Sequence, residues 1–99
     1  MPRFEDPVQA IGVGTGERFS IALACNPTTG YLWEAGVDAG YLELDSQEFE
    51  PAGGGVGAGG REVFHFNTLA PGETDISFEC RRPWDKTAHD TRQVRVRIE

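Results

Sequence analysis

Apolar and polar residues alternate with a period of two along most of this chain. The clearest case is residues 19–25, where one face carries Phe19, Ile21, Leu23 and Cys25. Such alternation is typical of a strand with one buried face, whereas no run of apolar residues at helical spacing is long enough to predict a helix. Glycine and proline residues separate the alternating runs and predict turns between them. The pattern therefore predicts an all-β protein.

The number of alternating runs predicts the architecture. Besides residues 19–25, the expected strands are residues 8–13, 31–34, 41–44 with 47–49 as one long strand or two short ones, 61–68, 74–79 and 94–98. About seven short strands in a chain of this length predict an immunoglobulin-like β-sandwich, with a small closed barrel as the alternative. In the last strand Arg95 and Arg97 point away from the apolar face, and outward arginines on a terminal strand would discourage edge-to-edge pairing.

Length and charge limit the possible functions. A chain of 99 residues has room for one core, so we expect a single domain over residues 1–99. A formal net charge of −7 argues against binding to nucleic acid as the main role. No apolar run approaches the length of a bilayer, and Met1 does not lead into a signal peptide, so membrane insertion is not expected. The compartment is periplasmic or secreted if a leader was removed, and cytoplasmic otherwise.

Two segments between expected strands have the composition of pre-shaped loops. In Asn26-Pro27-Thr28-Thr29-Gly30-Tyr31 the proline fixes φ and removes a backbone donor, and Gly30 permits a positive φ. The glycine run that ends in Gly57-Ala58-Gly59-Gly60 allows a backbone to approach another surface closely. This run also fits a G-x-G-x-x-G pattern, but the strand-like residues that follow it exclude a dinucleotide-binding turn, which requires a helix.

A third segment, Arg82-Pro83-Trp84, follows the sixth expected strand. In a sandwich of this type the loops after the second, fourth and sixth strands gather at one end, so the three segments are expected to form one surface. Trp84 would add a large, rigid aromatic group of the kind that dominates interface energies.

The three segments together resemble the chagasin family of cysteine-peptidase inhibitors. The family's Asn-Pro-Thr-Thr-Gly motif matches residues 26–30, its Gly-x-Gly-Gly motif matches residues 57–60, and its Arg-Pro-Trp motif matches residues 82–84. Trp33 also matches a tryptophan that the family has after the first motif. The resemblance implies a monomeric, reversible, tight-binding inhibitor of papain-like cysteine peptidases, which occludes the active-site cleft with these three loops. It implies peptidase-binding roles for Asn26, Pro27, Thr28, Thr29, Gly30, Tyr31, Gly57, Ala58, Gly59, Gly60, Arg82, Pro83 and Trp84.

Other functions find less support in the sequence. The alternative is a generic immunoglobulin-like adhesion or carbohydrate-binding module. An enzyme is not expected, because neither His65 nor His89 has an identifiable third group to orient it as a general base. Two histidines without a Cys-x-x-Cys pattern make no case for a metal, and no cofactor is expected.

Cys25 and Cys80 each fall at the end of an expected strand, on its core-facing side. In an immunoglobulin-like sandwich these strands lie in facing sheets, where a bridging disulfide can form. The sequence leaves two alternatives, a Cys25–Cys80 disulfide and two buried free thiols. We predict the disulfide, which would stiffen the base of two of the loops.

Overall fold

The computed structural model describes residues 2–25, 30–51 and 59–99, with the backbone alone described at Cys25. The regular structure of these residues is all-β, as predicted, and none of them forms a helix long and apolar enough to cross a membrane. The strands are β1 (Arg3–Glu5), β2 (Ala10–Val13), β3 (Arg18–Cys25), β4 (Leu32–Gly36), β5 (Leu42–Pro51), β6 (Gly60–Thr68), β7 (Gly72–Arg81) and β8 (Asp90–Ile98).

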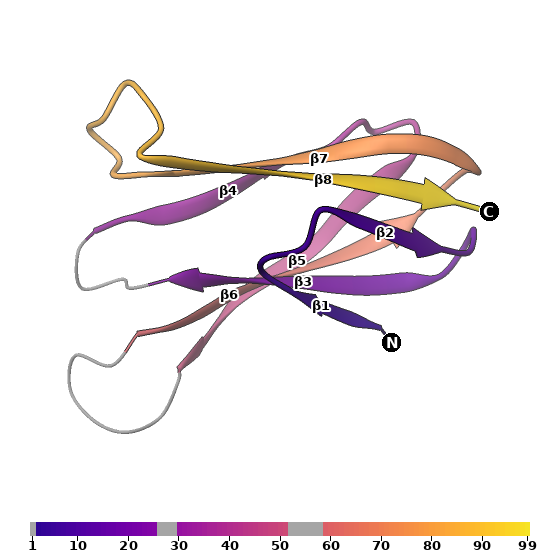
Figure 1. The fold of residues 1–99 in the computed structure, drawn as a ribbon, viewed down its shortest axis with the longest axis horizontal. Helices are drawn as coiled ribbons and strands as arrows, with labels where there is room; N and C mark the ends of the chain where they lie inside the picture. The colour runs from indigo at the N-terminus through magenta and orange to yellow at the C-terminus, as the bar shows by residue number, and fades with distance from the viewer. Residues whose placement is uncertain (1, 26–29, 52–58) are drawn as a thin grey trace.

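Two four-stranded sheets face each other (Figure 1). The first sheet has the order β1-β3-β6-β5 and the second has the order β2-β8-β7-β4. Hairpin neighbours β5–β6 and β7–β8 pair antiparallel, and the chain crosses between the sheets from β3 to β4. This arrangement confirms the predicted two-sheet sandwich.

The beginning of the chain divides its strands between both sheets. β1 pairs parallel with β3, and β2 pairs parallel with β8. The expected single strand over residues 8–13 is therefore shorter than predicted, and β1 was not predicted at all. The two expected runs at residues 41–44 and 47–49 form one strand, β5, which has a register shift between Leu44 and Ser46.

β8 lies inside the second sheet, between β2 and β7. The prediction that its outward arginines guard an open edge is therefore wrong. Arg95 instead forms ion pairs across the outer face of the sheet, with Asp75 at 2.7 Å and with Glu73 at 3.4 Å. Position in the sheet depends on which strands pair, and the alternation within one strand does not reveal that.

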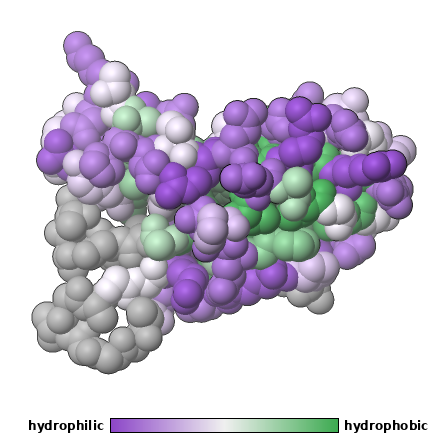
Figure 2. Space-filling view, viewed as in Figure 1, coloured by the Kyte–Doolittle hydropathy of each residue, from purple (hydrophilic) through white to green (hydrophobic). Residues whose placement is uncertain are grey.

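The core lies between the inner faces of the sheets and is rich in phenylalanine. Phe64 and Phe66 of β6 meet Phe78 of β7 with ring centroids 5.2 and 6.4 Å apart, and Phe19 of β3 stacks on Phe66 at 5.3 Å. All four side chains are fully buried. Seen edge-on, apolar residues appear along the seam between the sheets, over β2 and β3, and hydrophilic residues cover most of the surrounding surface (Figure 2).

Among the described residues, one carboxylate is also buried. Glu62 of β6 is 7% exposed and pairs across the sheet with Leu23 and Phe49. Its side chain accepts a hydrogen bond from Gln47 Nε2 at 3.0 Å. Burial raises the pKa of Glu62 above its usual value, and the hydrogen bond from Gln47 offsets this only in part. The charged form of Glu62 therefore opposes folding.

We expect Glu62→Gln to stabilise the protein at neutral pH. Since the folded-state pKa is raised, the cost of Glu62 is absent below the ordinary pKa of about 4.3 and grows as pH rises above it. The variant should gain a few degrees in Tm at neutral pH, the change that about 1 kcal/mol produces in a domain of this size. Thermal unfolding followed across the acidic and neutral range would measure the gap. Glu43→Gln, at an exposed position of β5, is the matched control, and a gap that does not change with pH would contradict the account.

Candidate functional site

The three segments singled out in the sequence leave the sandwich from the same end. In the first sheet, Gly60 pairs with Cys25 on one side and with Pro51 on the other. In the second sheet, Leu32 at the start of β4 pairs with Arg81 at the end of β7. The neighbouring residue of β7, Cys80, pairs with Asp90 at the start of β8. The ends of β3, β5 and β7 and the starts of β4, β6 and β8 therefore lie together, at the left of Figure 1. We refer to this part of the molecule as the loop end.

Part of the predicted site can be placed. The predicted residues outside the described ranges are Asn26, Pro27, Thr28, Thr29, Gly57 and Ala58. The predicted residues that are described are Gly30, Tyr31, Gly59, Gly60, Arg82, Pro83 and Trp84. These seven all lie at the loop end, and contacts join the first motif to the third.

Residues 82–85 form a turn that directs Trp84 outward. Asp85 N donates to Arg82 O at 3.0 Å, which is the hydrogen bond of a β-turn, and Pro83 occupies the second position that proline favours. The Trp84 side chain is 70% exposed. This exposure excludes a core position for Trp84.

Arg82 is engaged within this turn. Its guanidinium donates to both carboxylate oxygens of Asp85, from Nε at 2.9 Å and from Nη2 at 3.2 Å. The same guanidinium carbon lies 5.1 Å from the ring centroid of Tyr31 and 5.3 Å from that of Trp84. The hydrogen bond from Arg82 lowers the pKa of Asp85, so the carboxylate is charged at neutral pH. In the free chain Arg82 thus contacts its own turn and Tyr31 of the first motif.

Gly30 joins the first motif to the third. It has a positive φ of 81°, and a Cβ at this position would lie 3.6 Å from Trp84 Cη2 and 3.8 Å from Arg82 Cγ. These are ordinary contact distances, so the requirement for glycine comes from the backbone conformation. The predicted positive φ is confirmed.

Tyr31 also contacts His89, a residue that precedes β8. Their rings are 4.5 Å apart between centroids, and His89 N donates to Cys80 O at 2.7 Å. Asp85 and the contact of His89 with Tyr31 were missed from the sequence. The signal for Asp85 was its place three residues after Arg82, across a turn with proline at the second position.

The second motif ends at Gly60, a position where the surrounding atoms leave room only for glycine. A Cβ on Gly60 would lie 2.6 Å from Phe49 Cζ and would also meet the backbone oxygen of Glu50. The Phe49 ring therefore covers the space where another residue would carry its side chain. This contact ties the start of β6 to the end of β5.

Apolar exposure is concentrated at the loop end. Among the described residues the exposed large hydrophobic side chains are Leu32, Phe49, Leu69 and Trp84. Three of the four lie at the loop end, and Leu69 lies at the opposite end, after β6. Exposed apolar groups gathered in one region are typical of a protein-binding surface.

The predicted disulfide between Cys25 and Cys80 is not formed, because Cys80 is a buried free cysteine. A disulfide between the two would have to bridge the gap between β3 of the first sheet and β7 of the second. Here Trp33, the cross-strand partner of Cys80, spans the gap: its indole Nε1 donates to Ala24 O of β3 at 2.9 Å. Burial raises the pKa of the Cys80 thiol, which makes it a poor nucleophile.

Ser20, His65 and Glu48 form a hydrogen-bonded row of side chains with the composition of a hydrolase triad. His65 lies 2.7 Å from Ser20 Oγ through Nδ1 and 2.8 Å from Glu48 Oε1 through Nε2. Ser20 is only 2% exposed, and its backbone N donates to Pro2 O at 3.0 Å, so the N-terminal segment covers it. A substrate has no access to this hydroxyl. The three groups connect β3, β6 and β5 and belong to the scaffold.

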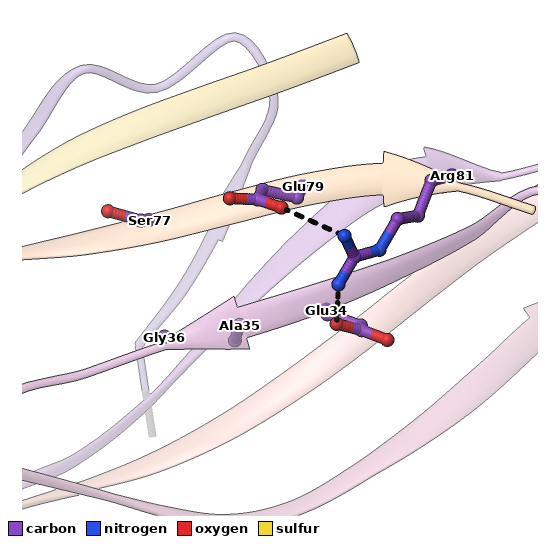
Figure 3. Close-up of a pocket in the computed structure, with 6 residues that line it drawn as sticks. All are labelled: Glu34, Ala35, Gly36, Ser77, Glu79 and Arg81. Carbon is purple, nitrogen blue, oxygen red and sulfur yellow. Dashed lines mark hydrogen bonds and ion pairs between the residues drawn. The ribbon is translucent and has the colours of Figure 1, made fainter. Parts of the chain in front are cut away.

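A shallow hollow on the outer face of β4 and β7 is also unsuited to catalysis (Figure 3). Arg81 crosses it and pairs with Glu34 at 3.1 Å and with Glu79 at 3.8 Å. Ala35, Gly36 and Ser77 complete its lining, which contains no histidine to serve as a base for the serine.

Comparison with known proteins identifies the family. The sequence model of the chagasin family peptidase inhibitor I42 matches residues 12–98. Chagasin from Trypanosoma cruzi is 33% identical over 90 residues, which are 85% of this chain and 82% of chagasin. The chain therefore belongs to the chagasin family of peptidase inhibitors. This membership confirms the prediction of a cysteine-peptidase inhibitor rather than an enzyme.

Solved structures confirm the fold. The cysteine protease inhibitor EhICP2 from Entamoeba histolytica superposes with a TM-score of 0.86 at 20% identity, over 98% of this chain and 94% of EhICP2. PbICP-C, solved in complex with falcipain-2, superposes with a TM-score of 0.72 at 18% identity, over 98% of this chain and 89% of PbICP-C. At these identities the likeness concerns the immunoglobulin-like sandwich alone.

Proposed function

We propose that the chain inhibits papain-like cysteine peptidases by placing its loop end in the active-site cleft. The observation that carries this proposal is the cluster at the loop end, where Trp84 is held outward by a turn that its own neighbours stabilise. A surface that is already ordered loses little conformational entropy on binding. Family membership and the complex of PbICP-C with falcipain-2 support the same class of partner.

The proposed mechanism is steric occlusion. Residues 26–31, 57–60 and 82–84 would fill the cleft and keep substrate from the catalytic cysteine. Trp84 would supply a rigid apolar anchor, and Gly59 and Gly60 would permit close backbone approach on the other side of the cleft. The catalytic cysteine of the enzyme is the nucleophile, and occlusion of the cleft requires no covalent bond between it and a carbonyl of the inhibitor.

Inhibition should be reversible and should leave the chain intact. We expect papain hydrolysis of a fluorogenic peptide to fall with inhibitor concentration at or below the micromolar range, about −8 kcal/mol of binding free energy. Dilution should restore activity, and the intact mass of the chain should be unchanged after long incubation with active enzyme. Absence of inhibition at high micromolar concentration, or a stable covalent adduct, would contradict the proposal.

The loss of one exposed aromatic side chain should separate binding from folding. Trp84→Ala is expected to raise the inhibition constant about thirtyfold, the equivalent of about 2 kcal/mol, because it removes the apolar anchor. The Tm should change little, since the side chain is 70% exposed. Leu69→Ala, which removes an exposed apolar group at the opposite end, is the matched control and should leave both quantities unchanged. An unfolded Trp84→Ala variant, or one with normal inhibition, would contradict the assignment of Trp84 as an exposed binding residue.

A further inference from the structure

Arg82 and Asp85 are joined more closely than an ordinary surface ion pair. Two side-chain hydrogen bonds link the guanidinium to the carboxylate, and Arg82 N also donates to Asp85 Oδ2 at 3.4 Å. The backbone bond from Asp85 N to Arg82 O completes the set. A bidentate pair fixes the plane of the guanidinium, which a single contact would leave free to rotate.

The orientation of this plane matters because two rings lie against it. Tyr31 stands at the start of the segment that leads into β4, and Trp84 stands on the turn after β7. The guanidinium carbon of Arg82 is within 5.3 Å of the centroid of both rings. Arg82 is therefore the link between two segments that are more than 50 positions apart in the chain, and Asp85 determines how that link is oriented.

We propose that Asp85 is a positioning residue: its carboxylate aligns the Arg82 guanidinium against Tyr31 and Trp84, so that the two segments meet a peptidase as one rigid unit. This inference rests on the proposed function for its effect on inhibition. Its effect on Trp84 is a property of the uncomplexed protein and can be measured without any peptidase.

The geometry indicates what Asp85→Asn would change. An asparagine presents one acceptor oxygen and one amide donor, so one of the two guanidinium bonds is lost and the other is no longer assisted by a negative charge. The turn itself should persist, because the backbone bond to Arg82 O and Pro83 are retained. Trp84 should then sample several orientations in the free protein and should dissociate from a peptidase sooner.

The chain offers a matched control for the loss of charge. Asp75 also pairs with an arginine, Arg95, at 2.7 Å, but it lies on the outer face of β7. Asp75→Asn removes the same charge and a single aspartate–arginine contact without touching the loop end. A difference between the two variants therefore reports position rather than net charge.

Asp85→Asn should raise the inhibition constant for papain about tenfold, mainly through a faster dissociation rate, while Asp75→Asn leaves it unchanged. The Arg82→Lys background tests whether Asp85 acts through Arg82. Lysine keeps the charge but lacks the planar fork, so adding Asp85→Asn should cause little further loss.

An indole signal supplies the readout that is independent of the enzyme. The two tryptophans give two Nε1–H resonances in a ¹⁵N-labelled sample, and the Trp84 resonance is the one that Trp84→Ala removes. Its heteronuclear NOE should fall in Asp85→Asn and stay unchanged in Asp75→Asn, while that of Trp33 is constant in both. An unchanged Trp84 NOE in Asp85→Asn would overturn the positioning role. If the wild-type chain does not inhibit papain, the proposed function fails, and the NOE still decides whether Asp85 orders Trp84.

Discussion

The contact between phenylalanines of the two sheets is the constraint on which the loop end depends. Phe64 and Phe66 come from one sheet and Phe78 from the other, and their rings meet within 6.4 Å between centroids. This packing sets the separation and the relative position of the sheets. Since β6 and β7 both lie inside their sheets and belong to the β5–β6 and β7–β8 hairpins, their relative position in turn fixes where the hairpin ends lie. Segments that belong to different sheets can then form a single surface.

Nearer the loop end, polar contacts rather than apolar packing connect the two sheets. The Trp33 indole bridges the sheets through Ala24 O, and Arg92 lies over its ring at 5.6 Å. Arg92 also pairs with Asp6 at 3.0 Å and with Asp90 at 2.6 Å, which lowers the pKa of Asp90. These contacts anchor the start of β8 beneath the turn that carries Trp84. The exposed tip can therefore be ordered without a disulfide.

The alternation of side chains was sufficient to predict the strands whose inner face is apolar. β3 and β6 begin within one residue of their expected starts, because the side chains on their inner faces are apolar and buried. β8 begins at Asp90, four residues before the expected start at residue 94, because the alternation of buried side chains covers only its second half. β1 was not predicted, because it is only three residues long and is defined by its pairing with β3. A pattern within the segment itself does not encode that pairing. The interior position of β8 was missed for the same reason.

The candidate site was predictable to a similar extent. Three motifs and the sandwich topology sufficed to expect a shared surface at one end. The contacts of Arg82 within the chain were not predictable, because they depend on how the turn at residues 82–85 folds. The free Cys80 could not be predicted either, because the side chain that occupies the gap between the sheets, Trp33, comes from a third strand.

The central claim is that the loop end is the surface that meets the peptidase. Its most direct test is to titrate ¹⁵N-labelled chain with catalytically blocked papain and to follow backbone amide signals. The account predicts that the largest changes fall on Gly30, Tyr31, Gly59, Gly60 and Trp84, and that the opposite end around Thr15 and Leu69 is unaffected. Changes centred on the outer face of β5, or at the opposite end, would contradict it.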